Sequence, residues 1–315
     1  MKHSLFILAA LATCLFSEPA AAWNERGHMA VAGVAWEHMT PAARQRASAL
    51  VKLNPSYAKW TTGVPEAEKD RVAFMKAATW PDEIRSNPAY IDDGYEPDGP
   101  AASQNIGYGD KLLHRYWHFK DFPFSPDGTQ TEDPFSPNAV TQIVAFTATL
   151  GAVEASDDVQ SYGLAWLLHL VGDIHQPLHS TSRFTHSTPK GDNGGNSVMV
   201  CLEVANRCDS QHSGKLHSFW DGAVGSSSKS SSVLSLVRRL PTSAAPDLAR
   251  TDPNGWAEES FRIAQRVAYS APVGQAKGPY RLDREYRIVA GSVAERRIAL
   301  AGERLAILIN SRLGN

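Results

Sequence analysis

Long hydrophobic segments and basic clusters are both missing from most of this 315-residue sequence. Beyond residue 22, no stretch is apolar enough to span a bilayer, so we expect no membrane association. The 31 lysines and arginines are spread along the chain beside 33 aspartates and glutamates, which gives a formal net charge of −2. Such a chain does not resemble proteins that bind duplex nucleic acid through counterion release. A polyanionic ligand would need local positive charge, which bound divalent cations can supply.

Residues 1–22 have the pattern of a secretory signal peptide. Lys2 gives a positive start, the stretch from Leu5 to Phe16 is apolar, and Ala20-Ala21-Ala22 forms a small-residue cleavage site. The apolar run is too short for a stop-transfer helix. We therefore expect cleavage after Ala22, a secreted or periplasmic protein, and one mature domain at 23–315.

Cysteine is scarce, with three residues in the whole sequence. Cys14 belongs to the expected signal peptide, which leaves Cys201 and Cys208 as a close pair in an exported protein. A disulfide that closes a short loop is the natural expectation. A zinc-binding pair is the alternative, although no histidine spacing accompanies it.

Helical periodicity dominates the mature sequence. At Thr40-Pro41 a helix start is expected, because threonine suits the N-cap and proline the first turn. Helices are expected over residues 31–39, 41–52, 69–78, 138–153, 157–176, 233–240, 256–269 and 283–315. Loops are expected at 87–110 and 125–137, and a serine-rich linker at 226–232. Residues 197–204 suggest a short strand, one arm of a hairpin closed by the disulfide. The expected fold is all-α, a single mostly helical domain with long loops and one short β-hairpin.

The stretch from Trp166 to His179 carries the densest chemistry. His169 and Asp173 are four residues apart in an apolar run, so they share one face of a buried helix. Pro177 ends the helix, and the turn brings His179 back toward the same region. Imidazoles and a carboxylate in apolar surroundings need a compensating partner. Zinc suits this ligand set, while a core helix with hydrogen-bonded polar residues is the alternative.

Further nitrogen and oxygen ligands occur in aromatic or apolar settings elsewhere. They are His28 close to Trp23, Asp82, His118, and the pair His217 and Asp221 at helical spacing. Taken singly, each is most simply a structural residue. His38, His114, His186 and His212 are expected to be ordinary histidines, and His175, which is offset from the His169/Asp173 face, is expected to support the structure.

Five motifs occur in order along the chain. They are Trp23-x-x-x-Gly27-His28, Trp80-x-Asp82, Trp117-His118-Phe119, His169-x-x-x-Asp173-x-x-x-x-x-His179 and His217-x-x-x-Asp221. Together they resemble the secreted, zinc-dependent, single-strand-specific nucleases of the S1/P1 nuclease family, which shares a superfamily and its helical fold with zinc-dependent phospholipase C. The resemblance covers the whole mature chain. Asn24 and Pro81 depart from the residues that the family often has there, but neither position supplies a ligating side chain.

The resemblance implies three zinc ions in one cleft. The first would be held by Asp82, His118, His169 and Asp173. The second would be held by the amino nitrogen and carbonyl oxygen of Trp23 with His28, and Asp173 would bridge the two ions. The third would be held by His179, His217 and Asp221. A free α-amine at Trp23 exists only after processing, which would tie export to activity.

The same resemblance assigns residues to the substrate. Asp82 and Arg85 would be catalytic, with Arg85 pairing with the phosphate. Phe119 would stack on a base and Asp121 would bond to its edge. For the opposite wall of this base site, Phe184 or Thr185 is a guess, and Asp192 and Asn193 are expected to support ligands or contact nucleotide.

The expected activity is hydrolysis of single-stranded RNA and DNA to 5′-nucleotides, with removal of phosphate from 3′-nucleotides, by a monomeric enzyme. A hydroxide bridging two zinc ions would be the nucleophile. The alternative enzyme is a zinc-dependent phospholipase C, which Phe119 and Asp121 disfavour because a choline headgroup needs no base clamp. A structural zinc protein is a third possibility, but structural sites are usually closed and four-coordinate.

Overall fold

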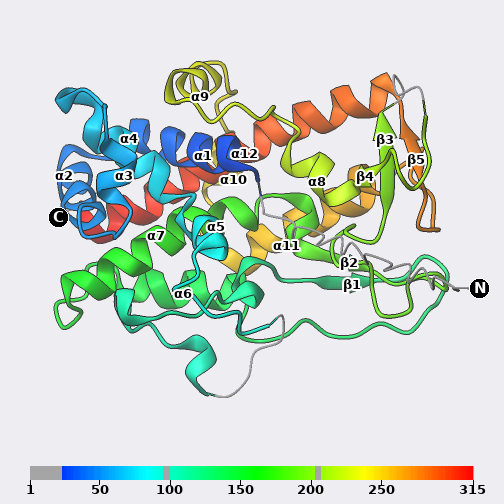
Figure 1. Cartoon of the computed structure of the whole chain (residues 1–315), viewed down its shortest axis with the longest axis horizontal. Coiled ribbons are helices and arrows are strands. Elements are labelled where there is room, and N and C mark those ends of the chain that lie inside the picture. Colours follow the sequence, from blue (N-terminus) through cyan, green and yellow to red (C-terminus); the bar gives the residue numbers. More distant parts are fainter. Residues whose placement is uncertain (1–22, 95–99, 203–206, 315) are drawn as a thin grey trace, which may run out of the picture.

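The computed structural model describes residues 23–94, 100–202 and 207–314. The expected signal peptide at 1–22 lies outside the described residues, as do positions 95–99 of the first expected loop and 203–204 of the expected strand. The described chain is mostly helical, as expected (Figure 1). In the part that is described, no helix is both long and apolar enough to cross a bilayer.

The helices follow one another with short connections and a few long loops. The α-helices are α1 (Glu25–His38), α2 (Pro41–Val51), α3 (Tyr57–Thr61), α4 (Lys69–Ala77), α5 (Trp80–Glu83), α6 (Ala139–Thr149), α7 (Asp157–Asp173), α8 (Leu216–Asp221), α9 (Ser230–Val237), α10 (Ala245–Leu248), α11 (Pro253–Ile263) and α12 (Arg284–Leu313). Single turns of tighter or wider helix are η1 (Glu66–Glu68), η2 (Ile84–Ser86), η3 (Pro100–Ser103), η4 (Gly107–Gly109), η5 (Arg115–His118), η6 (Pro177–Ser180) and η7 (Ala264–Ala268).

Side-chain caps fix where several of these helices begin. Thr40 accepts a hydrogen bond from the Ala43 amide at 3.2 Å, as the Thr40-Pro41 signal predicted. Asn138 caps α6 through a capping box with Thr141. This helix ends at Thr149, four residues before the expected end, and Gly151 follows it with a φ of 81°. A positive φ suits glycine, so the chain turns there instead of continuing the helix.

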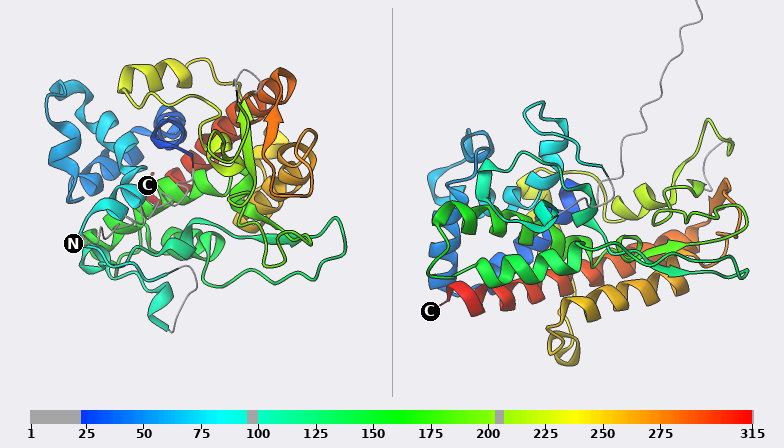
Figure 2. Two further views of the ribbon diagram at one scale, coloured as in Figure 1. Left: turned by 45° about the vertical axis from the view of Figure 1, so that its right-hand side comes forward. Right: turned by 90° about the horizontal axis from the view of Figure 1, so that it is seen from below.

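Helix α7 lies in the interior, with α6, α2 and α12 packed around it. The long helix α12 crosses the whole molecule, and α1 packs along it (Figures 1 and 2). These helices bury one large hydrophobic cluster that contains Trp80, Trp117 and Trp166. A second, smaller cluster, including Leu178, Leu216 and Trp220, lies beside a three-stranded sheet. The residues with candidate chemistry come from elements of both clusters.

Two small sheets complete the fold, built from β1 (Phe122–Phe124), β2 (Thr181–Arg183), β3 (Met199–Leu202), β4 (Gly214–Lys215) and β5 (Tyr280–Leu282). β3 pairs with β4 in antiparallel fashion, which confirms the expected hairpin, and with β5 in parallel. β1 and β2 pair in parallel, with Phe122 opposite Thr181. The sequence did not indicate β1, β2 and β5, because segments of three residues are too short to show alternation.

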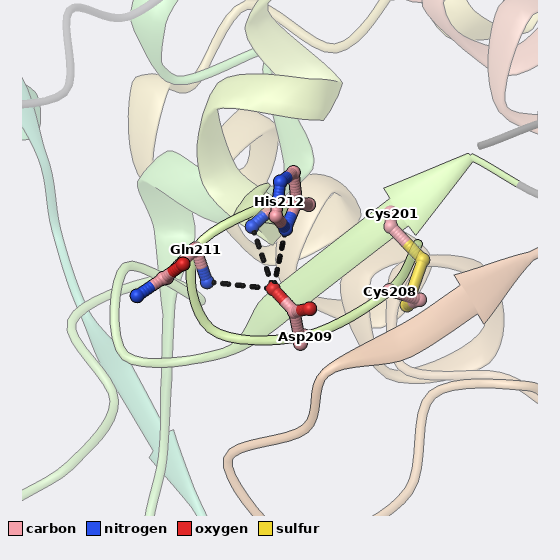
Figure 3. The surroundings of a disulfide bond; sticks show 5 residues. All are labelled: Cys201, Cys208, Asp209, Gln211 and His212. Carbon is pink, nitrogen blue, oxygen red and sulfur yellow. Dashed lines mark hydrogen bonds and ion pairs between the residues drawn. A yellow bond between two sulfur atoms is a disulfide. The ribbon is translucent and has the colours of Figure 1, made fainter. Parts of the chain in front are cut away.

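Cys201 and Cys208 form a disulfide, with their Cα atoms 5.8 Å apart (Figure 3). The expected pairing is therefore confirmed over the zinc alternative. Just beyond Cys208, the Asp209 carboxylate accepts hydrogen bonds from the Gln211 amide at 3.0 Å and from His212 Nδ1 at 2.6 Å. The disulfide joins β3 to the segment that leads into β4 and then α8.

The serine-rich stretch is not the linker that its composition predicted. Its last residues, from Ser230, begin α9, because the hydrophobic positions Val233 and Leu236 bury one face of that helix. Arg26 of α1 also holds the stretch, donating to the Ser227 carbonyl at 2.9 Å and to the Ser232 hydroxyl at 2.6 Å. Tertiary contacts here outweigh local composition.

Candidate functional site

His169 and Asp173 lie one turn apart on α7 and are both fully buried. His169 Nδ1 lies 2.8 Å from the carbonyl oxygen of Ala78, a pure acceptor, so Nδ1 carries the proton. In the neutral ring, His169 Nε2 therefore carries the lone pair, 3.2 Å from Asp173 Oδ2. Helix α7 thus presents one nitrogen ligand and one carboxylate to the same point, as the spacing in the sequence predicted.

The two oxygens of Asp173 face different histidines. Oδ2 lies 3.1 Å from His118 Nδ1, whereas Oδ1 lies 3.3 Å from His28 Nε2. Asp82 approaches from α5, with its Oδ1 3.8 Å from His169 Nε2. Ligand atoms fall within 4.8 Å of one another in two overlapping triads, His28/Asp82/His169 and His118/His169/Asp173. A carboxylate placed this way could bridge two metal ions.

A second cluster of possible ligands joins η6 to α8. His179, His217 and Asp221 present ligand atoms within 4.8 Å of one another. The Nε2 atoms of His179 and His217 are 2.9 Å apart. Their Nδ1 atoms lie 2.8 Å from the carbonyl oxygen of His118 and 2.7 Å from that of Gly194, respectively. Both rings therefore carry the proton on Nδ1 and turn a lone pair toward the same space.

The donor atoms present fit bound metal ions. Two imidazole lone pairs facing each other at 2.9 Å repel unless a cation lies between or beside them. The same holds for His118 Nδ1 and His169 Nε2, also 2.9 Å apart, unless a proton is shared. Other buried ligand atoms of these clusters lack a hydrogen-bond partner, among them both ring nitrogens of His28, His118 Nε2 and Asp173 Oδ1. Buried polar atoms are normally satisfied, so the chemistry of these atoms fits a bound cation.

Burial also keeps most of these side chains in the form that binds metal. It lowers the pKa of His28, His118 and His179 well below the usual value, and that of His217 to about 4. Neutral imidazole is the form with a lone pair for a metal. Burial also raises the pKa of Asp173 to about 6 and that of Asp221 well above its usual value. A nearby dication would favour the charged carboxylates.

His169 is the exception among these histidines. Burial by itself would lower its pKa, but the negative charges of Asp173 and Asp82 outweigh burial and raise it. The pKa values of His169 and Asp173 are both raised, so the pair favours holding a proton, which a bound metal ion would replace.

Gly172 allows α1 to approach α7 closely enough for His28 to reach Asp173, and Gly27 leaves room for Trp23 to pack against α1. A Cβ on Gly172 would lie 3.1 Å from His28 Nδ1, and one on Gly27 would lie 2.6 Å from the Trp23 Cβ. The indole nitrogen of Trp23 donates to the Gly172 carbonyl at 3.0 Å. Trp23 is fully buried, and its indole lies against the residue that precedes Asp173.

Arg85 lies at the more exposed edge of the first cluster. Its Nη2 is 3.1 Å from Asp82 Oδ1, and the two side chains are 12% and 18% exposed. Both residues come from the continuous turn formed by α5 and η2. The guanidinium is thus held within reach of an anion that approaches Asp82.

A pocket lies beside the segment that follows His118, and Phe119 and Asp121 line it. His118 precedes this segment, and the Lys120 amide donates to the His179 carbonyl at 3.0 Å. The pocket and the His179/His217 pair therefore share a piece of backbone. Burial, reinforced by the charge of Asp192, raises the pKa of Asp121 well above its usual value, which favours a carboxyl that can also donate.

Two more phenylalanines line this pocket. Phe184, guessed from the sequence as the opposite wall, is one of them. Thr185, the other guess, is buried instead, with its hydroxyl 2.8 Å from that of Thr188. Phe135, which is 44% exposed in the loop at 125–137, also lines the pocket. Sequence reasoning missed Phe135, although a large aromatic residue in a polar loop was a signal for it.

The glycine-rich turn after β2 has two separate roles. Asp192 is fully buried, and its Oδ1 accepts hydrogen bonds from the Arg183 amide at 3.0 Å and the Gly195 amide at 3.1 Å. It therefore supports the turn whose Gly194 carbonyl orients His217. Asn193 lines the pocket instead. The structure thus places Asp192 beneath the turn and Asn193 at the pocket.

The remaining histidines lie away from both clusters in the described chain. His175 is buried, and its Nε2 accepts from Arg304 at 2.9 Å while its Nδ1 bonds to the Val171 carbonyl. His114 bonds to Asp110 at 2.7 Å. His186 and His212 each bond to a neighbouring aspartate near the surface.

Comparisons with known proteins agree with this geometry. The family model described as S1/P1 Nuclease matches residues 23–314. Endonuclease 3 of Arabidopsis thaliana is 26% identical over 330 aligned positions, which cover 97% of this chain and 94% of the relative. Endonuclease 4 of the same plant is 24% identical, covering 91% of this chain and 88% of the relative. The family match spans the described helices and both clusters, and the chain therefore belongs to the S1/P1 nuclease family.

Proposed function

We propose that this chain is a zinc-dependent endonuclease that hydrolyses phosphodiester bonds of single-stranded RNA and DNA to 5′-nucleotides and also acts as a 3′-nucleotidase. Membership of a nuclease family supports a hydrolase acting on nucleic acid, and the related plant proteins are named endonucleases. The observation that carries the proposal is the convergence of two buried histidine–aspartate clusters, which the backbone of residues 118–121 connects to an aromatic pocket.

We assign three zinc ions to these clusters. Asp82, His118, His169 and Asp173 would hold the first. The N-terminus of Trp23 and His28 would hold the second, with Asp173 shared between the first two. His179, His217 and Asp221 would hold the third. Zinc in these positions would supply an acidified water as nucleophile and positive charge for the phosphate.

The chain's own residues would orient the substrate. Arg85, held by Asp82 at 3.1 Å, would pair with phosphate oxygens and stabilise the added negative charge of the transition state. Phe119 would stack against a base, which requires a strand whose bases are free to leave the duplex. Asp121 would bond to the edge of that base. Arg85 and the bound zinc ions would supply positive charge for the phosphate, so the enzyme would not need the basic patch that the sequence lacks.

A phospholipase C built on the same fold is the alternative. The pocket disfavours it, because three phenylalanines with a partly buried acid offer more to a flat base than to a small headgroup.

We also propose that the protein is exported. A signal peptide at residues 1–22 would be removed to leave one catalytic domain at 23–315, and the disulfide supports an oxidising compartment.

A single comparison tests the proposal. Mature, zinc-loaded protein should be offered single-stranded RNA, single-stranded DNA, 3′-AMP and phosphatidylcholine side by side. We expect turnover of the first three and none of the lipid. Turnover of phosphatidylcholine alone would replace the nuclease with a phospholipase, and no turnover by a fully metallated protein would refute both.

A further inference from the structure

Gln176 occupies a position in the turn after α7 that none of the roles above assigns. Its side chain is fully buried. The amide nitrogen Nε2 donates to Asp221 Oδ1 at 2.8 Å, and the amide oxygen Oε1 accepts from the Leu178 backbone amide at 2.6 Å. One side chain therefore connects the turn that carries His179 with the helix that carries Asp221.

The two contacts determine which way the amide points. A backbone N–H can only donate, so the atom facing Leu178 must be the oxygen. The nitrogen then faces Asp221 and can only donate to it. An ionised carboxylate is the acceptor that gains most from such a bond in a buried place. The backbone therefore fixes Gln176 as a donor to Asp221.

The rest of the turn is held independently of this side chain. The Ile174 carbonyl accepts from the Ser260 hydroxyl at 2.5 Å, and the His175 carbonyl accepts from Arg297 Nε at 3.2 Å. The Gln176 carbonyl accepts from the His179 amide at 3.0 Å. Because these bonds hold the backbone of the turn, the Nε2 bond of Gln176 acts specifically on Asp221.

Asp221 is otherwise weakly oriented. It is 6% exposed, and His217 Nε2 lies 3.6 Å from its Oδ1, too far for a hydrogen bond. The bond from Gln176 occupies one lone pair of Oδ1. It leaves the other lone pair and Oδ2 for a cation near His179 and His217.

We propose that Gln176 is the positioning residue of the third metal site, where it fixes the rotamer of Asp221 against the turn that carries His179. This inference rests on the proposed zinc site. Hydrogen-bond partners of metal ligands typically change metal affinity by about 10- to 100-fold when removed. Gln176 should therefore govern metal retention at one site and leave the other two unchanged.

The test uses Gln176→Met, which keeps the volume but removes both hydrogen bonds, with Gln160→Met as the matched control. Gln160 is also a buried glutamine, and it bonds to backbone groups of the loop before α7, at Gly151 and Ala155. Zinc per chain is measured after gel filtration, and zinc affinity by competition with a chromophoric chelator. We expect Gln176→Met to retain one zinc fewer than wild type, or to bind its weakest zinc about 10- to 100-fold less tightly. Gln160→Met should lose thermal stability without losing zinc.

A second variant and a double-mutant cycle keep the inference testable if Gln176→Met does not fold. Gln176→Asn retains a buried amide but is one methylene too short to reach both partners, so it should show the same zinc loss. In an Asp221→Ala background, either change should have no further effect on zinc binding, because Gln176 acts through Asp221. Wild-type zinc affinity in both Gln176 variants, or an equal loss with and without Asp221, would overturn the inference while the proposed function stands. A wild-type protein that binds no zinc would instead defeat the proposed function.

Discussion

The indole nitrogen of Trp23 donates a hydrogen bond to the carbonyl oxygen of Gly172 at 3.0 Å. Gly172 directly precedes Asp173 in the chain. The first residue of the expected mature protein is thereby fixed beside the carboxylate that faces His28 on one side and His118 on the other. This placement makes the state of the N-terminus a direct test of the metal site.

An added residue before Trp23 should nearly abolish activity without unfolding the protein. The α-amine has a pKa near ~8 and can lose its proton to zinc at neutral pH, whereas an amide is a poor zinc ligand. Protein carrying an extra methionine or a tag should lack the zinc assigned to Trp23 and His28 but keep that of His179, His217 and Asp221. Trimming back to Trp23 with a protease should restore both zinc and activity. Equal activity before and after trimming would show that the amine is not a ligand.

Removal of metal should destabilise the protein as well as inactivate it. The facing lone pairs of His179 and His217, and of His118 and His169, would then lose the cation that separates them. A ligand present at 1,000 times its dissociation constant stabilises the native state by about 4 kcal/mol. We expect a lower melting temperature after chelation, recovery on adding zinc, and close to three zincs per chain by metal analysis. Unchanged melting and full activity in zinc-free protein would contradict the assignment.

The aromatic pocket should contribute to nucleotide binding from two sides. Phe119→Ala should weaken binding by about 1–3 kcal/mol with zinc content intact, because stacking on one base has about that value. Phe135→Ala should weaken it as well, if the loop at 125–137 supplies a wall, and calorimetry with a non-hydrolysable dinucleotide would measure both. Val144→Ala, a surface change on α6, is the control. Asp121→Ala should change the order of preference among bases more than the rate on the best one. Wild-type binding by Phe119→Ala would place the base site elsewhere.

His114 should stabilise the protein most in mildly acidic solution. Burial opposes its charge, but hydrogen bonds to Asp110 and Asp93 raise its pKa above the usual 6.5. Below pH 6.5 the protonated ring bonds both carboxylates, and this contribution is lost as the pH rises through the raised pKa. Removing one partner of a buried pair typically costs about 3–5 kcal/mol.

Urea unfolding of wild type and His114→Gln should therefore differ most between about pH 5 and 6.5, and the difference should shrink toward pH 9. Measuring both proteins in the same zinc concentration cancels the titration of the metal ligands. A difference that grows with pH would mean that His114 is neutral in the folded protein.

Much of the site was predictable because its ligands are spaced by helical geometry. His169 and Asp173, and likewise His217 and Asp221, are one turn apart, and the sequence places each pair on one helix face without any tertiary information. The spacing of residues in the sequence did not show that the two pairs lie close together in the fold. It depends on the turn at Gln176 and on backbone carbonyls of Ala78, His118 and Gly194 that set the histidine tautomers. Only the resemblance to a known family anticipated it.

The missed parts have a common cause. Phe135, β1, β2 and β5 acquire their roles from partners distant in the chain, and their own segments are short or irregular. The beginning of α9 was misread because serine composition favours a loop until contacts such as that with Arg26 decide otherwise. Local signals identify long periodic helices well and short, context-dependent segments poorly.

The backbone bond between Lys120 and His179 also limits how such an enzyme can diversify. Residues 118–121 contain a proposed ligand, the stacking ring and the base-reading acid, so a shift that suits a new base would disturb His179 at the same time. Among the described residues, no hydrogen bond of this kind joins the loop at 125–137 to a proposed metal ligand. The loop reaches the same pocket through Phe135. Altered base preference should therefore be easier to evolve, or to engineer, by exchanging this loop than by changing the residues that contact the base most directly.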